Sequence, residues 1–131
     1  PSRVSFVQGD AMDLPAGFNG FDRVHASNLI CRLPDPQKLL DRLPSILAEG
    51  GEVVLATPFS WLEQYTPKDK WPQGDSWEWL KSKMEPRFEL LHETDEPFLI
   101  REHGRKFQLG VSKISVWKLR CVGWQAANIG I

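Results

Sequence analysis

The fold is decided by three short apolar runs: Val4-Ser5-Phe6-Val7-Gln8-Gly9-Asp10-Ala11, Gly20-Phe21-Asp22-Arg23-Val24-His25-Ala26-Ser27-Asn28 and Gly50-Gly51-Glu52-Val53-Val54-Leu55-Ala56-Thr57-Pro58. Each run ends in small or polar residues, which is typical of a buried strand bounded by turns. A helical segment separates the second run from the third. This pattern predicts an α/β fold with a parallel sheet, whose strands are Val4–Val7, Phe21–Ala26 and Val53–Ala56.

The helix before the third run has recognisable start and stop signals. Asp35 can cap the exposed amides at its start, and Pro36 suits the first helical position. Pro44 interrupts the pattern and should kink or shorten the helix, and Gly50-Gly51 should end it. One apolar face is formed by residues at helical spacing: Leu39, Leu40, Leu43, Ile46 and Leu47.

The second half of the chain has weaker patterns. Residues 59–74 hold aromatic residues, lysines and prolines without periodicity, as a substrate loop or lid would. A helix should begin near Asp75 or Ser76 and run to about Met84.

Beyond this helix, two more strands are expected, at Phe88–Leu91 and at Val111–Leu119. Pro97–Gln108 should form an extended connection between them. The domain is expected to cover residues 1–120. Residues 121–131 carry no strong pattern, and we expect them to form a disordered tail.

Composition indicates an ordinary globular domain. The chain has 131 residues, of which 25% are charged and 41% hydrophobic, and its net charge is −1. A nucleic-acid partner is not expected because no basic run or excess is present. No apolar run approaches the roughly 20 residues that span a membrane, so we expect neither a membrane span nor a signal peptide. Cys31 and Cys121 fit no metal-ligand spacing, so we expect two reduced thiols, no metal site and a cytoplasmic location.

Two polar residues follow predicted strands, where ligands bind in open α/β sheets. Asp10 and Asn28 can each accept a hydrogen bond from an exocyclic adenine amine or orient a ribose. Taken singly, each is as often a turn residue or a helix cap. The ordered set of three strand ends with their spacing is therefore stronger evidence than either residue alone.

This series of strand ends resembles the second half of a class I S-adenosylmethionine-dependent methyltransferase. The resemblance implies a partial Rossmann-like sheet that lacks its first two strands, with S-adenosylmethionine as cofactor. It also implies that the Gly9-Asp10-Ala11 turn lines the adenine pocket and that Asn28 lies beside the sulfonium and the incoming nucleophile. The implied cofactor-binding residues are Asp10, Ala11, Met12, Asn28 and Leu29.

Three further stretches resemble the methyltransferase domain of ovothiol biosynthesis, which methylates a side-chain nitrogen of mercaptohistidine. The first is residues 28–36, and the second is residues 57–71 with the run Trp61-Leu62-Glu63, Thr66-Pro67-Lys68 and Lys70-Trp71. The third is residues 97–102 with residues 105–108 and the later Val116-Trp117. The substrate implied is a histidine-derived thiol. Asn28 and Tyr65 are the implied catalytic residues, and the implied substrate contacts are Arg32, Trp61, Tyr65 and Arg101.

The chemistry implied makes few demands on the protein. Methyl transfer from a sulfonium is an in-line displacement, and an imidazole nitrogen is a free base near neutrality. A polar clamp is needed for the amino-acid part of the substrate, and Arg101 could pair with its carboxylate. Plainer alternatives are that Arg101 belongs to a solvated basic face and that Trp61 and Tyr65 only pack.

The family's glycine-rich cofactor loop and its ribose-binding acidic residue have no counterpart in this sequence, so we expect little cofactor affinity from the chain alone. One edge of the Phe21–Ala26 strand should lack a partner. Either Val4–Val7 closes onto that edge, or the chain pairs with a second copy or with a portion that precedes it. The alternatives in function are a methyltransferase for another small metabolite and a non-catalytic domain that acts through protein association.

Overall fold

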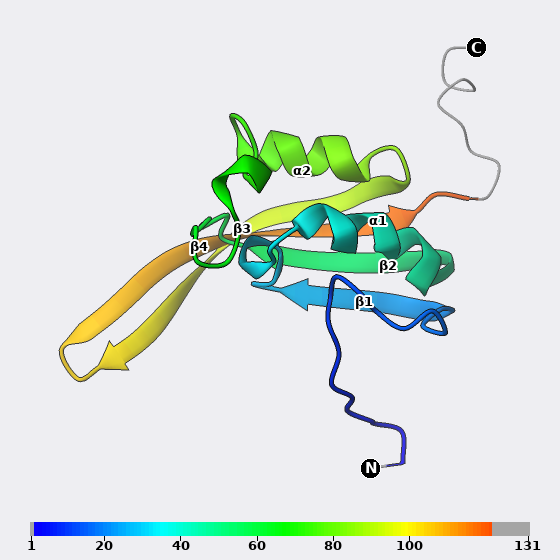
Figure 1. The fold of residues 1–131 in the computed structure, drawn as a ribbon, viewed down its shortest axis with the longest axis horizontal. Coiled ribbons are helices and arrows are strands. Elements are labelled where there is room, and N and C mark those ends of the chain that lie inside the picture. The colour runs from blue at the N-terminus through cyan, green and yellow to red at the C-terminus, as the bar shows by residue number, and fades with distance from the viewer. Residues whose placement is uncertain (1, 122–131) are drawn as a thin grey trace.

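The computed structural model describes residues 2–121, and Figure 1 shows its arrangement. Four strands form one mixed sheet in the order β1-β2-β4-β3. Strand β1 (Phe21–Ser27) runs parallel to β2 (Leu47–Thr57), and β4 (Lys106–Leu119) runs antiparallel to both β2 and β3 (Phe88–His103). The predicted α/β class with a partial sheet is confirmed.

Two helices and two short 3₁₀ turns complete the structure. Helix α1 (Pro36–Ile46) connects β1 to β2, and helix α2 (Ser76–Met84) precedes β3. The short turns are η1 (Ile30–Arg32) and η2 (Lys68–Lys70). Across residues 2–121, no helix has both the length and the apolar character that crossing a membrane would require.

The core lies between the helices and one face of the sheet. The apolar face predicted for the helix is confirmed for Leu39, Leu40, Leu43 and Ile46, which are buried in α1. The fifth predicted residue, Leu47, is buried too but begins β2. These residues join Val53, Leu55 and Trp117 of the sheet and Leu80 and Met84 of α2 in a single cluster. Four tryptophans pack in pairs, Trp61 with Trp79 and Trp77 with Trp117, with ring centroids 5.8 and 6.1 Å apart.

Strand β2 begins earlier than the glycine pair predicts. Helix α1 ends at Ile46, two residues after Pro44, and β2 starts at Leu47. The pair Gly50-Gly51 lies inside β2, where the register against β1 shifts. Gly50 has a φ of 72°, and a Cβ on Gly51 would lie 3.1 Å from the Phe21 carbonyl oxygen. The two glycines therefore do not end the helix. They allow the bulge in β2 and the close approach of β2 to β1.

Residues 4–7 are not a strand, which corrects the sequence prediction. They have no regular structure, and the Phe6 side chain is 94% exposed. A strand needs a neighbour to pair its backbone groups, and within residues 2–121 these residues have none. The predicted closure of Val4–Val7 onto β1 is therefore wrong, and β1 is an edge strand of the described sheet.

The predicted extended connection at residues 97–108 is also corrected. These residues belong to β3 and β4, which pair from Phe88 with Leu119 to His103 with Lys106. The two strands thus form one long hairpin, whose outer part extends beyond the rest of the sheet (Figure 1). The disordered tail predicted from residue 121 lies, beyond Cys121, outside the described residues.

Candidate functional site

The carboxyl ends of the parallel strands β1 and β2 meet at one edge of the sheet, because Ser27 pairs with Ala56. Asn28 follows β1 at this edge. Its backbone N–H donates to the Ala56 carbonyl oxygen at 2.7 Å, and the Ser112 hydroxyl of β4 donates to its side-chain oxygen at 3.3 Å. Asn28 is thereby held by residues of β2 and β4 while it stays exposed to solvent.

Two residues at this edge have left-handed backbone conformations. Asn28 has a φ of 54°, and Phe59, two residues beyond β2, has a φ of 52°. The Phe59 N–H donates to the buried Thr57 hydroxyl at 3.2 Å, which stabilises the turn. Asparagine adopts this conformation more readily than other non-glycine residues, whereas a phenylalanine there is uncommon. Such outliers cluster at functional sites, so this edge is the candidate site.

The turn predicted to line an adenine pocket is built around Asp10. Its carboxylate accepts a hydrogen bond from the Met12 N–H at 2.9 Å, and its carbonyl oxygen accepts one from the Asp13 N–H at 2.9 Å. Ala11 and Met12 are half-buried and pack against the core. Leu29, next to Asn28, is also half-buried against the core.

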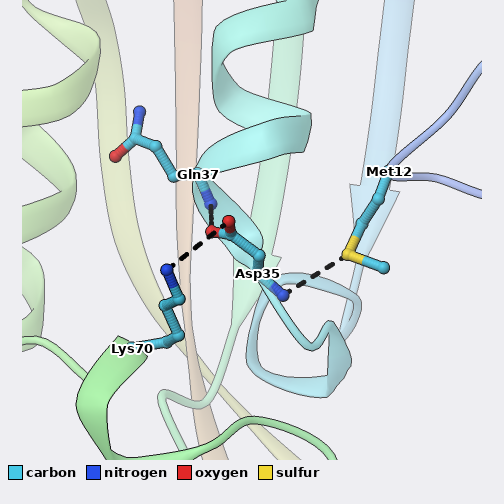
Figure 2. A network of polar contacts seen from close by, with 4 residues as sticks. All are labelled: Met12, Asp35, Gln37 and Lys70. Carbon is cyan, nitrogen blue, oxygen red and sulfur yellow. Dashed lines mark hydrogen bonds and ion pairs between the residues drawn. The ribbon is translucent and has the colours of Figure 1, made fainter.

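Figure 2 shows how this turn is fixed to the start of α1. The Asp35 N–H donates to the Met12 sulfur at 3.3 Å, and the Asp35 carboxylate caps α1 by accepting from the Gln37 N–H at 3.2 Å. The second carboxylate oxygen of Asp35 lies 3.9 Å from the Lys70 ammonium. Asp35 therefore joins the Met12 turn, the helix start and the loop after β2.

A hollow of about 310 Å³ lies beside the same turn. It is lined by Met12, Asp13, Leu14, Lys38, Asp41 and Arg42. Lys38, Asp41 and Arg42 of α1 were not predicted as site residues. The sequence does not reveal which polar residues of α1 lie next to the Asp10 turn.

Arg32 and Tyr65, both predicted to contact substrate, lie together. The Arg32 guanidinium lies over the Tyr65 ring, 5.2 Å from its centroid. It also donates to the Ser60 carbonyl oxygen at 2.7 Å and to the Ser60 hydroxyl at 3.2 Å. Arg32 thus fixes the start of the loop after β2, and Tyr65, 42% exposed, keeps one part of its ring open to solvent.

Trp61 is placed mainly by packing. Its ring meets Trp79 edge to face, and its indole N–H donates to the Ser76 hydroxyl at 3.1 Å. Trp61 is half-buried against α2, as the plainer of the two sequence interpretations has it. Its contact with substrate stays a prediction.

Arg101 is not brought to the other predicted residues. It pairs with Phe107 near the tip of the hairpin, five residues along β4 from Ser112, the partner of Asn28. At about 3.3 Å per residue, the separation along the strand is roughly 17 Å. A small substrate at Asn28 would not reach that far, so the predicted clamp has no support from this placement.

Ser60 and Ser112 are the polar partners that sequence reasoning missed. Each contacts a predicted residue from far along the chain, Ser60 through Arg32 and Ser112 through Asn28. No local motif marks either serine. The signal for Ser112 would have been the pairing of β4 with β2, which brings it to the ends of the parallel strands.

Comparison with known proteins identifies the family. The family described as "Methyltransferase domain" matches residues 3–106. The chain belongs to this family. A demethylmenaquinone methyltransferase from Clavibacter sepedonicus is 42% identical over 53 residues, which are 40% of this chain and 22% of that protein. The chain spans about a fifth of the length of the curated relatives that it matches.

Solved structures of the methyltransferase fold are also similar. A SAM-dependent methyltransferase from Methanosarcina mazei has a TM-score of 0.62 at 14% identity, over 86% of this chain and 66% of that one. The [4+2]-cyclase SpnF has a TM-score of 0.57 at 16% identity, over 92% of this chain and 58% of that one. At these identities the likeness is one of fold. Proteins of this fold thus serve more than one reaction.

Proposed function

We propose that this chain is part of an S-adenosylmethionine-dependent methyltransferase that acts on a small molecule. Membership of the methyltransferase domain family supports the reaction class. The observation that carries the proposal is Asn28, which hydrogen bonds from two strands hold in a left-handed conformation at the shared carboxyl edge of β1 and β2. That edge is where open α/β sheets bind their ligands.

The residues present fit the adenine end of the cofactor. Asp10 is exposed, and only one of its two carboxylate oxygens receives a hydrogen bond from the described residues. The other oxygen can accept from an exocyclic amine. Ala11 and Met12 supply an apolar surface next to it, as a flat aromatic base requires. These three residues and Asn28 would hold the cofactor, with Leu29 packing behind them.

When bound, the cofactor supplies a methyl group on a sulfonium, ready for in-line displacement. The work left to this chain is alignment, which can contribute a large part of the rate enhancement. The Asn28 oxygen is engaged by Ser112, so its amide N–H groups remain to orient a substrate. Tyr65, backed by the Arg32 guanidinium, can wall a flat ring. No catalytic base is needed for an imidazole acceptor.

We propose further that the acceptor is a side-chain nitrogen of mercaptohistidine. The support is the resemblance of residues 57–71 to the ovothiol methyltransferase domain, together with the hydrogen bonds that join Ser60 of this segment to Arg32. In this account Arg32 is a positioning residue, since its Nη atoms hold Ser60. Tyr65 is the residue of the loop that touches the substrate ring.

A methyl-transfer assay tests the proposal, using a labelled methyl donor with mercaptohistidine, histidine and a quinone as competing acceptors. It is run on the 131-residue chain and on any longer form of the protein that contains it. We expect methylated mercaptohistidine, and a loss of about tenfold or more in kcat/KM for Asn28→Ala. Glu49→Gln, exposed and distant, is the control. Preferential methylation of another acceptor would contradict the substrate assignment, and cofactor binding without any methylation would favour a non-catalytic role.

A further inference from the structure

The Arg32 guanidinium is a half-buried cation that has no counter-charge among the described residues. It forms no ion pair with any residue in the range 2–121. Its hydrogen bonds go to neutral acceptors, namely the carbonyl oxygens of Cys31 and Ser60, the Ser60 hydroxyl and the Cys31 sulfur. These acceptors satisfy N–H groups but leave the positive charge uncompensated, and a charge partly removed from water is costly unless it is paired.

The two lysines of the loop after β2 are, by contrast, paired. The Lys68 ammonium lies 3.0 Å from the Glu63 carboxylate, and the Lys70 ammonium lies 3.9 Å from the Asp35 carboxylate. Within the part of the chain that the structure describes, no carboxylate does the same for Arg32. The missing counter-charge is therefore a property of Arg32 and not of every cation in this region.

Ser60 is exposed, and the same cation holds its hydroxyl group. The hydroxyl oxygen accepts a hydrogen bond from Arg32 Nη2 at 3.2 Å. A serine hydroxyl has one O–H donor and two lone pairs, so its O–H remains free to donate. The Cys31 sulfur, at 4.0 Å, is a distant and weak acceptor for it. Because a hydrogen bond from a cation polarises the hydroxyl, Ser60 offers solvent a strengthened donor.

Arg32 and Ser60 both follow strands that end at the candidate site. The Arg32 backbone N–H donates to the Leu29 carbonyl oxygen at 2.9 Å, and Leu29 directly follows Asn28. Ser60 lies three residues beyond Thr57, the last residue of β2, which limits their separation to about 11 Å. Both residues are therefore close enough to the edge to contact a small substrate bound there.

The residue before Ser60 has a strained backbone. Phe59 has a φ of 52°, a conformation that costs free energy for a side chain of this kind. Contacts on either side of Phe59 maintain it, since its N–H donates to the buried Thr57 hydroxyl and Arg32 donates to the Ser60 carbonyl oxygen at 2.7 Å. Strain of this kind is concentrated at functional sites, which supports a role for the adjacent Ser60.

We propose that Ser60 and Arg32 form a subsite for an anionic group of the methyl acceptor, which makes Ser60 a specificity-determining residue. The Ser60 O–H donates to the anion, in a charge-assisted hydrogen bond that is stronger than a neutral one. Arg32 is the positioning residue, which holds the hydroxyl and supplies the counter-charge. The inference rests on the proposed function for the identity of the acceptor. Mercaptohistidine offers two groups of this chemistry, its carboxylate and its deprotonated thiol.

Calorimetric titration in the presence of S-adenosylhomocysteine tests the subsite without requiring turnover, on the 131-residue chain and on any longer form that contains it. Four ligands separate the two anionic groups. Mercaptohistidine carries both, histidine only the carboxylate, mercaptoimidazole only the thiol, and 4-methylimidazole neither. At about pH 9 the imidazole is a free base and a thiol is largely deprotonated. We expect histidine or mercaptoimidazole to bind about tenfold more tightly than 4-methylimidazole, and the one that does so identifies the group.

Three variants assign the preference to these residues. Ser60→Ala should raise the Kd of mercaptohistidine about tenfold and leave that of 4-methylimidazole within about threefold. Ser60→Thr keeps a hydroxyl and should restore mercaptohistidine binding to within about threefold. Arg32→Gln should remove the preference for anionic ligands, whereas a merely structural role would weaken all four ligands alike. Arg87→Gln, which removes an exposed guanidinium just before β3, is the control, and circular dichroism checks the fold of each variant.

The subsite is overturned if the unaltered protein binds none of the four ligands, or binds 4-methylimidazole as tightly as the anionic ones. It is also overturned if Ser60→Ala leaves mercaptohistidine binding unchanged or weakens all ligands equally. Failure of the proposed function has a different signature. The preference for anionic ligands and its loss in Ser60→Ala would then persist, while the methyl-transfer assay would detect no methylated product.

Discussion

Asn28 combines a backbone role with a side-chain role. Its φ of 54° is costly for most residues, and its side chain accepts from Ser112. Asn28→Ala and Asn28→Gly both lose the hydrogen bond, but only glycine accepts the backbone conformation without cost. We predict that Asn28→Ala is less stable than Asn28→Gly by about 1 kcal/mol in urea unfolding. Equal stabilities would show that the left-handed conformation is not maintained in solution.

Asp35 also has two roles, a helix cap and an ion pair, which two substitutions can separate. It caps α1 and lies 3.9 Å from Lys70 (Figure 2). Asp35→Ala loses the cap and should cost about 1 kcal/mol of unfolding free energy. Asp35→Asn keeps a capping oxygen and loses only a long, partly exposed ion pair, so its cost should stay under about 0.5 kcal/mol. If the two variants unfold alike in a thermal melt, the ion pair rather than the cap stabilises this junction.

Residue-level predictions from the sequence succeeded where the chemistry is local. Asp35 and Asp75 cap their helices by accepting hydrogen bonds from amides two and three residues further along the chain. Caps of this kind can be predicted from the local sequence. Partners that lie far apart in the chain were not predictable. Ser112 reaches Asn28 only because β4 pairs with β2, and no property of residues near 28 reveals that.

At the scale of elements, the loop after β2 is attached to the body through a buried threonine. Thr66 is fully buried, and its hydroxyl donates to the Leu33 carbonyl oxygen at 2.5 Å. The nearly isosteric Thr66→Val leaves that carbonyl without its partner and should cost about 1–3 kcal/mol. Thr94→Val, on a half-buried threonine of β3, should cost less than about 0.5 kcal/mol. Chemical unfolding of both variants compares them, and similar losses would contradict the proposed anchoring.

A helix or strand could be predicted from the sequence when interactions among its own residues stabilise it. Helix α2 and the start of α1 follow from caps and periodicity. Strands depend on neighbours, so residues 4–7 have a strand-like sequence but no regular structure, and β3 continues far past Leu91 because β4 accompanies it. The same dependence explains why Arg101 was assigned to a loop near the substrate instead of to the β3–β4 hairpin.

For the whole molecule, the exposed edge of β1 should be visible in hydrogen exchange. Strand β1 pairs with β2 on one side only, whereas β2 is paired on both sides. We predict that amides of β1 exchange faster than those of β2 at residues 53–56, since half of the β1 groups face an open edge. Equal protection of the two strands would mean that another segment or a second copy covers β1.

The central claim is that the carboxyl edge of β1 and β2, with the Asp10 turn, binds the methyl-donor cofactor. Calorimetric titration with S-adenosylhomocysteine tests it most directly, on the chain and on any longer form of the protein that contains it. The account predicts binding that Asp10→Ala weakens about tenfold, as loss of one charge-assisted hydrogen bond would. Asp22→Ala, which removes another exposed carboxylate at the opposite end of β1, should bind like the unaltered protein. No binding in any form, or binding indifferent to Asp10, would contradict the claim.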